Sequence, residues 1–242
     1  MRALRPQARD DRVTAVVIRR SAAAFVLFAL VASSCSQSDT DSANWLANTQ
    51  EQTYVEVPGA FKRFTVNPFR VNKFDRQAER VSGIPRNPAN WEVVFDSAKK
   101  PRVDNFDNPR PTAMVGSVAV YALEEDWTRS PNFRDALSVS TLRTYPLGRE
   151  GGLDPIAAFN SGDPDVEVVN YSETAEKNGI RGIKVRFNQR ISGSQWLTVD
   201  QQAFTNRKTN KVYVLTLKCS STCFKSQYAT AKKISSSFTV QK

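Results

Sequence analysis

SQWLTVDQQAFTNRKTNKVYVLTLKC (residues 194–219) contains a clear secondary-structure pattern. Two runs rich in β-branched and aromatic residues, 194–206 and 211–219, flank a polar turn around Arg207–Asn210. This arrangement predicts a long antiparallel hairpin. Shortly before it, GIKVRF (182–187) alternates strictly between apolar and charged residues. That alternation predicts a further strand with one face in the core and the other in solvent.

The regions around the hairpin predict further strands and helices. WEVVFDS (91–97) and MVGSVAVYAL (114–123) have the pattern of strands, the second one buried on both faces. Helices are expected from Ser130 to Arg143 and at LDPIAAF, where Asp154 is the N-cap and Pro155 opens the helix. SSFTV (236–240) predicts a closing strand or extended tail, and a helix before it carries an apolar face of Phe224, Tyr228, Ala231 and Ile234. One antiparallel sheet with helices packed against it is an α+β domain.

The first 35 residues have the pattern of an export or targeting segment. Six arginines and two aspartates precede SAAAFVLFALVAS (21–33), an uncharged run that ends in small residues. The run is shorter than the about 20 apolar residues of a transmembrane helix. Two interpretations stay open: LVASSC (30–35) is a lipobox in which Cys35 carries lipid, or the segment directs the chain to the thylakoid lumen. Residues 36–53 predict a polar tether, and residues 54–242 predict one domain.

Much of the positive charge lies in one short segment. Without residues 1–34 the formal net charge falls from +10 to +6, because six of the 34 basic and two of the 24 acidic residues are lost. Residues 60–86 carry a net +5 of that charge, because seven basic residues interleaved with phenylalanines outnumber Asp75 and Glu79. The seven are Lys62, Arg63, Arg70, Lys73, Arg76, Arg80 and Arg86. We expect them to form a docking surface for an acidic protein or an anionic membrane. The alternative is a solvated charged face whose phenylalanines fill the core.

Composition excludes several kinds of chemistry. The chain has no histidine, which excludes Ser-His and Cys-His nucleophile pairs and every histidine metal site. No phosphate-binding glycine motif occurs. Carboxylates gather at Glu124, Glu125 and Asp126 and again at Asp163, Asp165 and Glu167, but calcium takes about six to eight oxygens. We therefore expect solvated loop charges, with no catalytic residue, no metal site and no directly bound cofactor.

Two of the three cysteines lie close together near the end of the chain. KCSSTCFK (218–225) places Cys219 at the end of a predicted strand and Cys223 at the start of a predicted helix. The residues between them can turn and bring the Cβ atoms to the about 3.8 Å of a disulfide. Compartments outside the cytoplasm permit disulfides. We expect a structural bridge worth about 2 kcal/mol in the chain-entropy model. A thiol-redox pair and half of a zinc site are the alternatives.

Several of these stretches together resemble the PsbP-type domain family. They are NPANWEVVF (87–95), PRVDNFD (101–107), GSVAVY (116–121), KVYVLTLKC (211–219) and the helix that ends in SSFTV, and the resemblance covers residues 54–240. The family contains the extrinsic lumenal subunit of photosystem II and its relatives, with related domains in bacterial lipoproteins. The resemblance implies an α/β/α sandwich around a central antiparallel sheet. Residues 67–90 and 145–165 depart from the family's spacing, and its histidine metal contacts cannot exist here, so no metal ligand is carried over.

Three functional hypotheses follow. The first is a non-enzymatic, monomeric accessory or assembly protein that docks on the lumenal side of photosystem II. The resemblance implies that such a protein supports calcium and chloride retention at the water-oxidising cluster indirectly. The second is an exported bacterial lipoprotein, anchored through Cys35, that binds a small amphiphile or a protein partner. The third is a lumenal thiol-redox protein that uses Cys219 and Cys223. None of the three involves nucleic acid.

Overall fold

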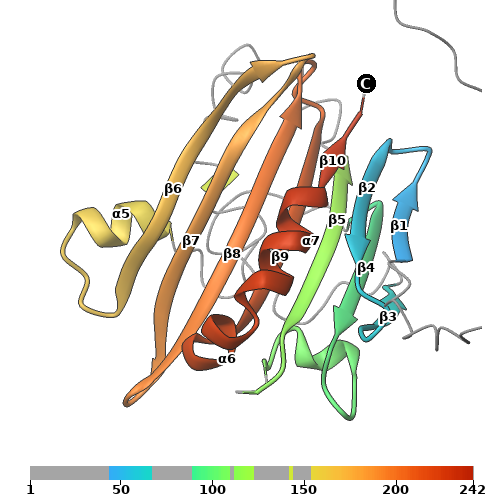
Figure 1. Ribbon diagram of the computed structural model, residues 1–242. Helices are drawn as coiled ribbons and strands as arrows, with labels where there is room; N and C mark the ends of the chain where they lie inside the picture. The colour runs from blue at the N-terminus through green and yellow to red at the C-terminus, as the bar shows by residue number, and fades with distance from the viewer. Residues whose placement is uncertain (1–43, 67–88, 110–111, 123–141, 144–153, 242) are drawn as a thin grey trace, which may run out of the picture. The chain divides into compact units, whose positions relative to one another are not determined.

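A seven-stranded antiparallel sheet forms the centre of the described chain (Figure 1). In spatial order its strands are β3 (Lys62–Thr65), β4 (Trp91–Asp96), β5 (Val115–Ala122), β9 (Lys211–Ser220), β8 (Gln195–Asn206), β7 (Ile180–Ser192) and β6 (Val166–Lys177). A smaller antiparallel sheet contains β1 (Asn44–Asn48), β2 (Thr53–Val57) and β10 (Thr239–Val240). This computed structural model describes residues 44–66, 89–109, 112–122, 142–143 and 154–241.

The helices are short and few within these described ranges. They are the 3-10 turn η1 (Val103–Asn105), α5 (Pro155–Asn160), α6 (Ser221–Ser226) and α7 (Tyr228–Ser237). None of the helices in the described residues is long and apolar enough to cross a membrane. The α+β class is therefore confirmed. The helix expected at 130–143 lies outside the described residues, except for Leu142 and Arg143.

The predicted hairpin is confirmed as the pair β8 and β9. Their register runs from Leu197 opposite Ser220 to Thr205 opposite Val212. The polar turn leaves Thr209 in the left-handed region, with φ 52°. Strands β4 and β5 also match their predictions, and β5 is buried on both faces as expected.

The sheet buries a different set of apolar side chains on each face, because side chains alternate along a strand. On the face covered by α6 and α7, β9 contributes Tyr213, Leu215, Leu217 and Cys219 to one core. On the opposite face the same strand contributes Val212 and Val214 to a second core. This double burial explains why the runs in β5 and β9 are nearly continuously apolar.

The predicted C-terminal helix is broken in two, and one residue of its predicted buried face is exposed. Ala231 and Ile234 are fully buried against the sheet, but the chain breaks into α6 and α7 at Gln227. Tyr228, expected on the buried face, is 46 % exposed. The break shifts the helical phase, so Tyr228 lies beside the packed face. The closing strand is β10, as predicted.

The structure differs from the sequence prediction at two other segments. The tether predicted for residues 36–53 is too long, because Asn44–Asn48 forms β1 and pairs along its whole length with β2. Leu46 packs against the core, which is the apolar contact that the polar composition concealed. Strand β6 was not predicted at all. It is an edge strand with mostly exposed side chains, so it lacks the alternation that identifies a strand.

Replacing Ile234 by Ala tests whether α7 is held by its buried face. Ile234 is 0 % exposed, and removing its side chain should lower the free energy of unfolding by about 2–4 kcal/mol. Lys232→Ala is the matched control on the exposed side of the same helix, with an expected change within about 0.5 kcal/mol. Urea unfolding measures both. Equal effects would contradict the packing described for α7.

Candidate functional site

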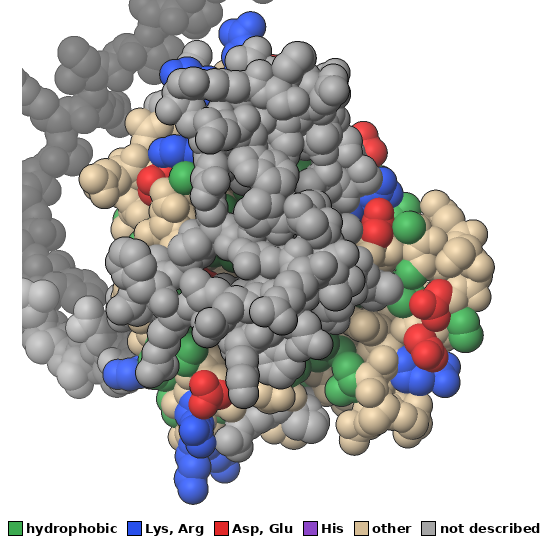
Figure 2. Space-filling model, turned by 180° about the vertical axis from the view of Figure 1, so that it is seen from behind, with side chains coloured by type: hydrophobic (Ala, Val, Ile, Leu, Met, Phe, Trp, Pro, Cys, Tyr) green, Lys and Arg blue, Asp and Glu red, His purple; other side chains and the backbone are tan. Residues whose placement is uncertain are grey.

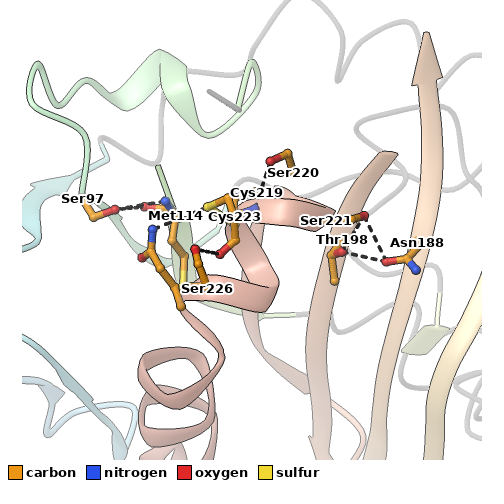
Figure 3. The surroundings of a disulfide bond; sticks show 10 residues. Ser97, Met114, Asn188, Thr198, Cys219, Ser220, Ser221, Cys223 and Ser226 are labelled. Carbon is orange, nitrogen blue, oxygen red and sulfur yellow. Dashed lines mark hydrogen bonds between the residues drawn. A yellow bond between two sulfur atoms is a disulfide. The ribbon is translucent and has the colours of Figure 1, made fainter. Parts of the chain in front are cut away.

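The corner between β9 and α6 is joined by the two cysteines. The structure brings Cys219 and Cys223 to disulfide distance, as predicted, with their Cα atoms 5.9 Å apart (Figure 3). Both side chains are buried. Ser220 lies between them as the N-cap of α6, and its hydroxyl accepts a hydrogen bond from the amide of Cys223 at 3.2 Å. The bridge and the cap together fix the direction in which α6 leaves the sheet.

The first turn of α6 meets a polar cluster on the sheet. The hydroxyl of Thr198 on β8 donates to Asn188 Oδ1 on β7 at 2.6 Å and lies 3.0 Å from the hydroxyl of Ser221 on α6 (Figure 3). Asn188 Nδ2 in turn donates to Glu167 on β6 at 2.7 Å. Hydrogen bonds therefore connect α6 with three neighbouring strands.

Arg186 on β7 is the main charged group beneath the two helices. Its Nη2 donates to Asp200 Oδ2 at 2.6 Å, and its guanidinium lies 5.2 Å and 5.1 Å from the ring centres of Phe224 and Tyr228. Ser235 on α7 also donates to Asp200, at 3.2 Å. Burial alone would lower the pKa of Arg186, but the interactions with Asp200, and to a smaller extent with Tyr228, outweigh it, so its pKa lies above its ordinary value.

A groove of about 600 Å³ runs along this junction between α6 and strands β6–β8. We call it the α6 groove. It is lined by Glu167, Val169, Arg186, Asn188, Trp196, Thr198, Ser221, Phe224, Lys225 and Tyr228. A second groove of about 580 Å³ shares Trp196 and Ser221 with it and reaches Cys223. Aromatic and aliphatic walls with a few amide and hydroxyl groups are typical of sites that bind small molecules.

The predicted docking residues are only partly described. Lys62 is exposed on β3, whereas Arg63 is half-buried and donates through Nη2 to the backbone oxygen of Val57 at 3.0 Å. Burial lowers the pKa of Arg63. Arg70, Lys73, Arg76, Arg80 and Arg86 lie outside the described residues, as does Cys35. A common docking surface of these residues therefore stays a prediction.

The predicted carboxylate cluster forms contacts within the protein. Asp165 forms an ion pair with Arg190 at 3.2 Å, and the carboxylate of Asp163 accepts from the backbone of residue 165. Glu167 accepts from Asn188, as described above. Glu124, Glu125 and Asp126 lie outside the described residues. In the part of the chain that is described, no three acidic or cysteine side chains are placed to hold a metal ion.

The sequence did not predict a site at the α6 groove, although three residues named from the sequence line it: Glu167 of the carboxylate cluster, and Phe224 and Tyr228 of the predicted apolar helix face. Arg186 was expected on a solvated face, because alternation identifies the face of a strand and not what covers it. No pattern in the sequence marks Trp196, Asn188 or Thr198 as a site residue. One pattern pointed to this region: Asp200, Gln201 and Gln202 follow one another in a strand that is buried throughout its middle. Buried polar residues in such a strand require partners, and Asp200 and Gln202 find them on β7 and α7.

Comparisons with known proteins found weak structural likenesses. No family model and no curated protein matches the chain. Among solved structures, it is similar to cyanobacterial PsbP (CyanoP) from Synechocystis sp. PCC 6803, with TM-score 0.44 and 14% identity over 86% of this chain and 98% of that chain. It is also similar to a Pseudomonas aeruginosa protein of unknown function, a putative regulator (TM-score 0.35, 11% identity, 83% of this chain and 98% of that chain).

A third likeness is to the Ran-binding protein Mog1p from Saccharomyces cerevisiae, with TM-score 0.37 and 9% identity over 82% of this chain and 96% of that chain. Likenesses at this level do not identify what the chain binds.

Removing the disulfide should destabilise the domain without unfolding it. Closing a loop of five residues contributes about 2 kcal/mol in the chain-entropy model, so Cys219→Ala/Cys223→Ala should lower the free energy of unfolding by about that amount. Reductant should destabilise the wild-type protein similarly and leave the double variant unchanged. Thiol labelling of the native protein is the complementary measurement. Two free thiols at Cys219 and Cys223 in the exported protein would refute the bridge.

Proposed function

We propose that this chain is an exported, non-enzymatic binding protein that works at a membrane surface and holds a small amphiphile in the α6 groove. The observation that carries the proposal is the groove itself, with Trp196, Phe224 and Tyr228 in its walls beside Asn188 and Thr198. The first 35 residues have the pattern of an export segment, which supports a location outside the cytoplasm. A buried cysteine bridge fits a compartment that permits disulfides.

An amphiphile suits the groove because apolar and polar groups line it together. Val169 is 51 % exposed and Tyr228 is 46 % exposed, so apolar surface remains for an acyl chain or ring. Asn188, Thr198 and Ser221 already form hydrogen bonds with one another, and a hydroxyl or amide can accept further bonds from a polar head. In this proposal Cys35 carries lipid and keeps the protein at an extracytoplasmic surface.

A second candidate is an accessory or assembly protein of photosystem II. The resemblance of residues 54–240 to the PsbP-type domain supports it. In that case the protein would be lumenal and would dock through the segment from Lys62 to Arg86. It would bind no cofactor itself and would support calcium and chloride retention indirectly.

A thiol-redox function is less well supported. Cys219 is 0 % and Cys223 is 5 % exposed, whereas catalytic cysteines are accessible to their substrates. The two cysteines join the end of β9 to the first turn of α6, and this position favours a structural role.

The mature N-terminus distinguishes the two settings. Mass spectrometry of the protein from its native membrane should find Cys35 as the first residue with a diacylglyceryl group. An unmodified N-terminus in a thylakoid-lumen fraction, with co-migration with photosystem II, would overturn the lipoprotein proposal in favour of the second candidate.

Replacing Trp196 by Ala tests the groove. Binding of a fluorescent amphiphile, dansyl undecanoic acid, should weaken by about tenfold or more, because a buried aromatic contact is worth about 1.4 kcal/mol or more. Trp45→Ala is the matched control, since Trp45 is 57 % exposed on β1 and does not line the groove. Equal loss in both variants, or no binding by the wild-type protein, would contradict the assignment. Thermal melting shows whether each variant is folded.

A further inference from the structure

One end of the seven-stranded sheet carries an exposed group of basic side chains. Strands β4 and β9 both end there, and β8 begins there, because neighbouring strands in the sheet are antiparallel. Lys99, Lys100 and Arg102 follow β4, and Lys62 on β3 lies opposite Asp96 at the foot of the same loop. We call Lys62, Lys99, Lys100 and Arg102 the basic end. Figure 2 shows Lys and Arg side chains at the lower left of the view, with others at its upper left and right.

The loop that carries three of these residues is held in place by a buried carboxylate. Asp96 is 1 % exposed, and its two oxygens accept hydrogen bonds from the amides of Ala98 and Arg102 at 2.8 Å and 3.0 Å. The side-chain amide of Asn105 donates to the same carboxylate. The loop is therefore pre-organised, with Lys99 and Lys100 exposed at its tip, which lowers the entropic cost of binding through it.

The lysines of the basic end are not neutralised within the described part of the chain. Among the described residues, no ion pair engages Lys62, Lys99 or Lys100, whereas ion pairs engage other cations: Arg143, Arg186, Arg190, Arg207, Lys211 and Lys233. Arg102 pairs with Asp104 at 3.3 Å, and both side chains are largely exposed, so this contact is weak. Asp107 is a second exposed acidic residue in the loop. The cations outnumber these two carboxylates.

Exposed aliphatic side chains accompany the charges. Val103 follows Arg102 directly and is 36 % exposed, and Ile191 at the end of β7 is 53 % exposed. Strand β7 ends on the same side of the sheet as β4 and β9, because it runs antiparallel to β8. The opposite end of the sheet also carries basic residues, Arg207 and Lys208 in the β8–β9 turn, and the contact of Arg207 with Glu176 at 3.9 Å is exposed and therefore weak as well. No large exposed aliphatic residue is found beside that turn in the described chain.

The described chain also begins near the basic end. Asn44 pairs with Val57, the last residue of β2, and the chain reaches Lys62 five residues later.

We propose that the basic end rests on an anionic lipid surface, with Lys62, Lys99, Lys100 and Arg102 near the headgroups and Val103 and Ile191 at the boundary with the acyl chains. This inference rests on the proposed function at a membrane surface. It identifies the part of the domain that contacts the membrane. Each cation near an anionic surface strengthens partitioning by about fivefold. Aliphatic side chains add apolar burial that salt does not screen.

Co-sedimentation with vesicles tests the proposal. The exported protein carrying Cys35→Ser, which removes the residue that would be lipidated, is mixed with vesicles of phosphatidylcholine and phosphatidylglycerol in a two-to-one ratio. Lys99→Glu/Lys100→Glu should weaken partitioning more than tenfold. The matched control Arg207→Glu/Lys208→Glu makes the same charge change at the opposite end of the sheet and should weaken it less than threefold. The preference for anionic over pure phosphatidylcholine vesicles should shrink as salt rises.

Equal losses in the two charge-reversal variants would overturn the proposal, since attraction would then follow net charge alone. Failure of the wild-type protein to prefer anionic vesicles would overturn it as well. So would binding to polyglutamate in the absence of vesicle binding, which would assign the basic end to an acidic protein. These outcomes are independent of the mature N-terminus and of the amphiphile assay, so the surface and the proposed function can fail separately.

Discussion

The position of α6 depends on the corner where β9 ends and the chain turns back over the sheet. Strand β9 lies between β5 and β8 and is buried on both faces, so its direction is fixed by the core. The bridge from Cys219 to Cys223 and the cap at Ser220 transmit that direction to α6. Phe224 then enters the core while the first turn meets Thr198 and Asn188. Without this corner, the helix residues that line one side of the α6 groove would not be held against the strands that line the other side.

The polar part of the sheet is a consequence of the same geometry. Strand β9 presents buried apolar side chains on the face that carries the helices, whereas β8 and β7 present Asp200 and Arg186 to the helices. A buried ion pair is costly unless further hydrogen bonds satisfy it, and Ser235 on α7 supplies one to Asp200. The rings of Phe224 and Tyr228 lie against the guanidinium. This ion pair fixes the position of the helices on the sheet more than it adds to the free energy of unfolding. It also makes the groove beside the helices partly polar.

Periodicity in the sequence was sufficient for the elements that bury an apolar face. It predicted β4, β5, the β8–β9 hairpin and the helix around Ile234. The cap of α5 at Asp154 was predictable from the residue types that begin helices. Periodicity failed for β6, whose side chains are mostly exposed, and for β1, in which Leu46 packs against the core within an otherwise polar segment. Both strands pair along their length with a neighbouring strand. The cysteine corner was predictable because strand and helix signals adjoin at residues 219–223. Arg186 was not, since its role depends on a helix that arrives from 35 residues further along the chain.

The bridge between Cys219 and Cys223 should hold α6 in place over the strands. Amide hydrogen exchange of the folded protein, with and without reductant, tests this. Reduction should speed exchange in α6 (residues 221–226) while β8 and β9 keep their protection, because local opening needs less free energy than global unfolding. Unchanged exchange in α6 would contradict the claim, and so would uniform loss of protection across the sheet.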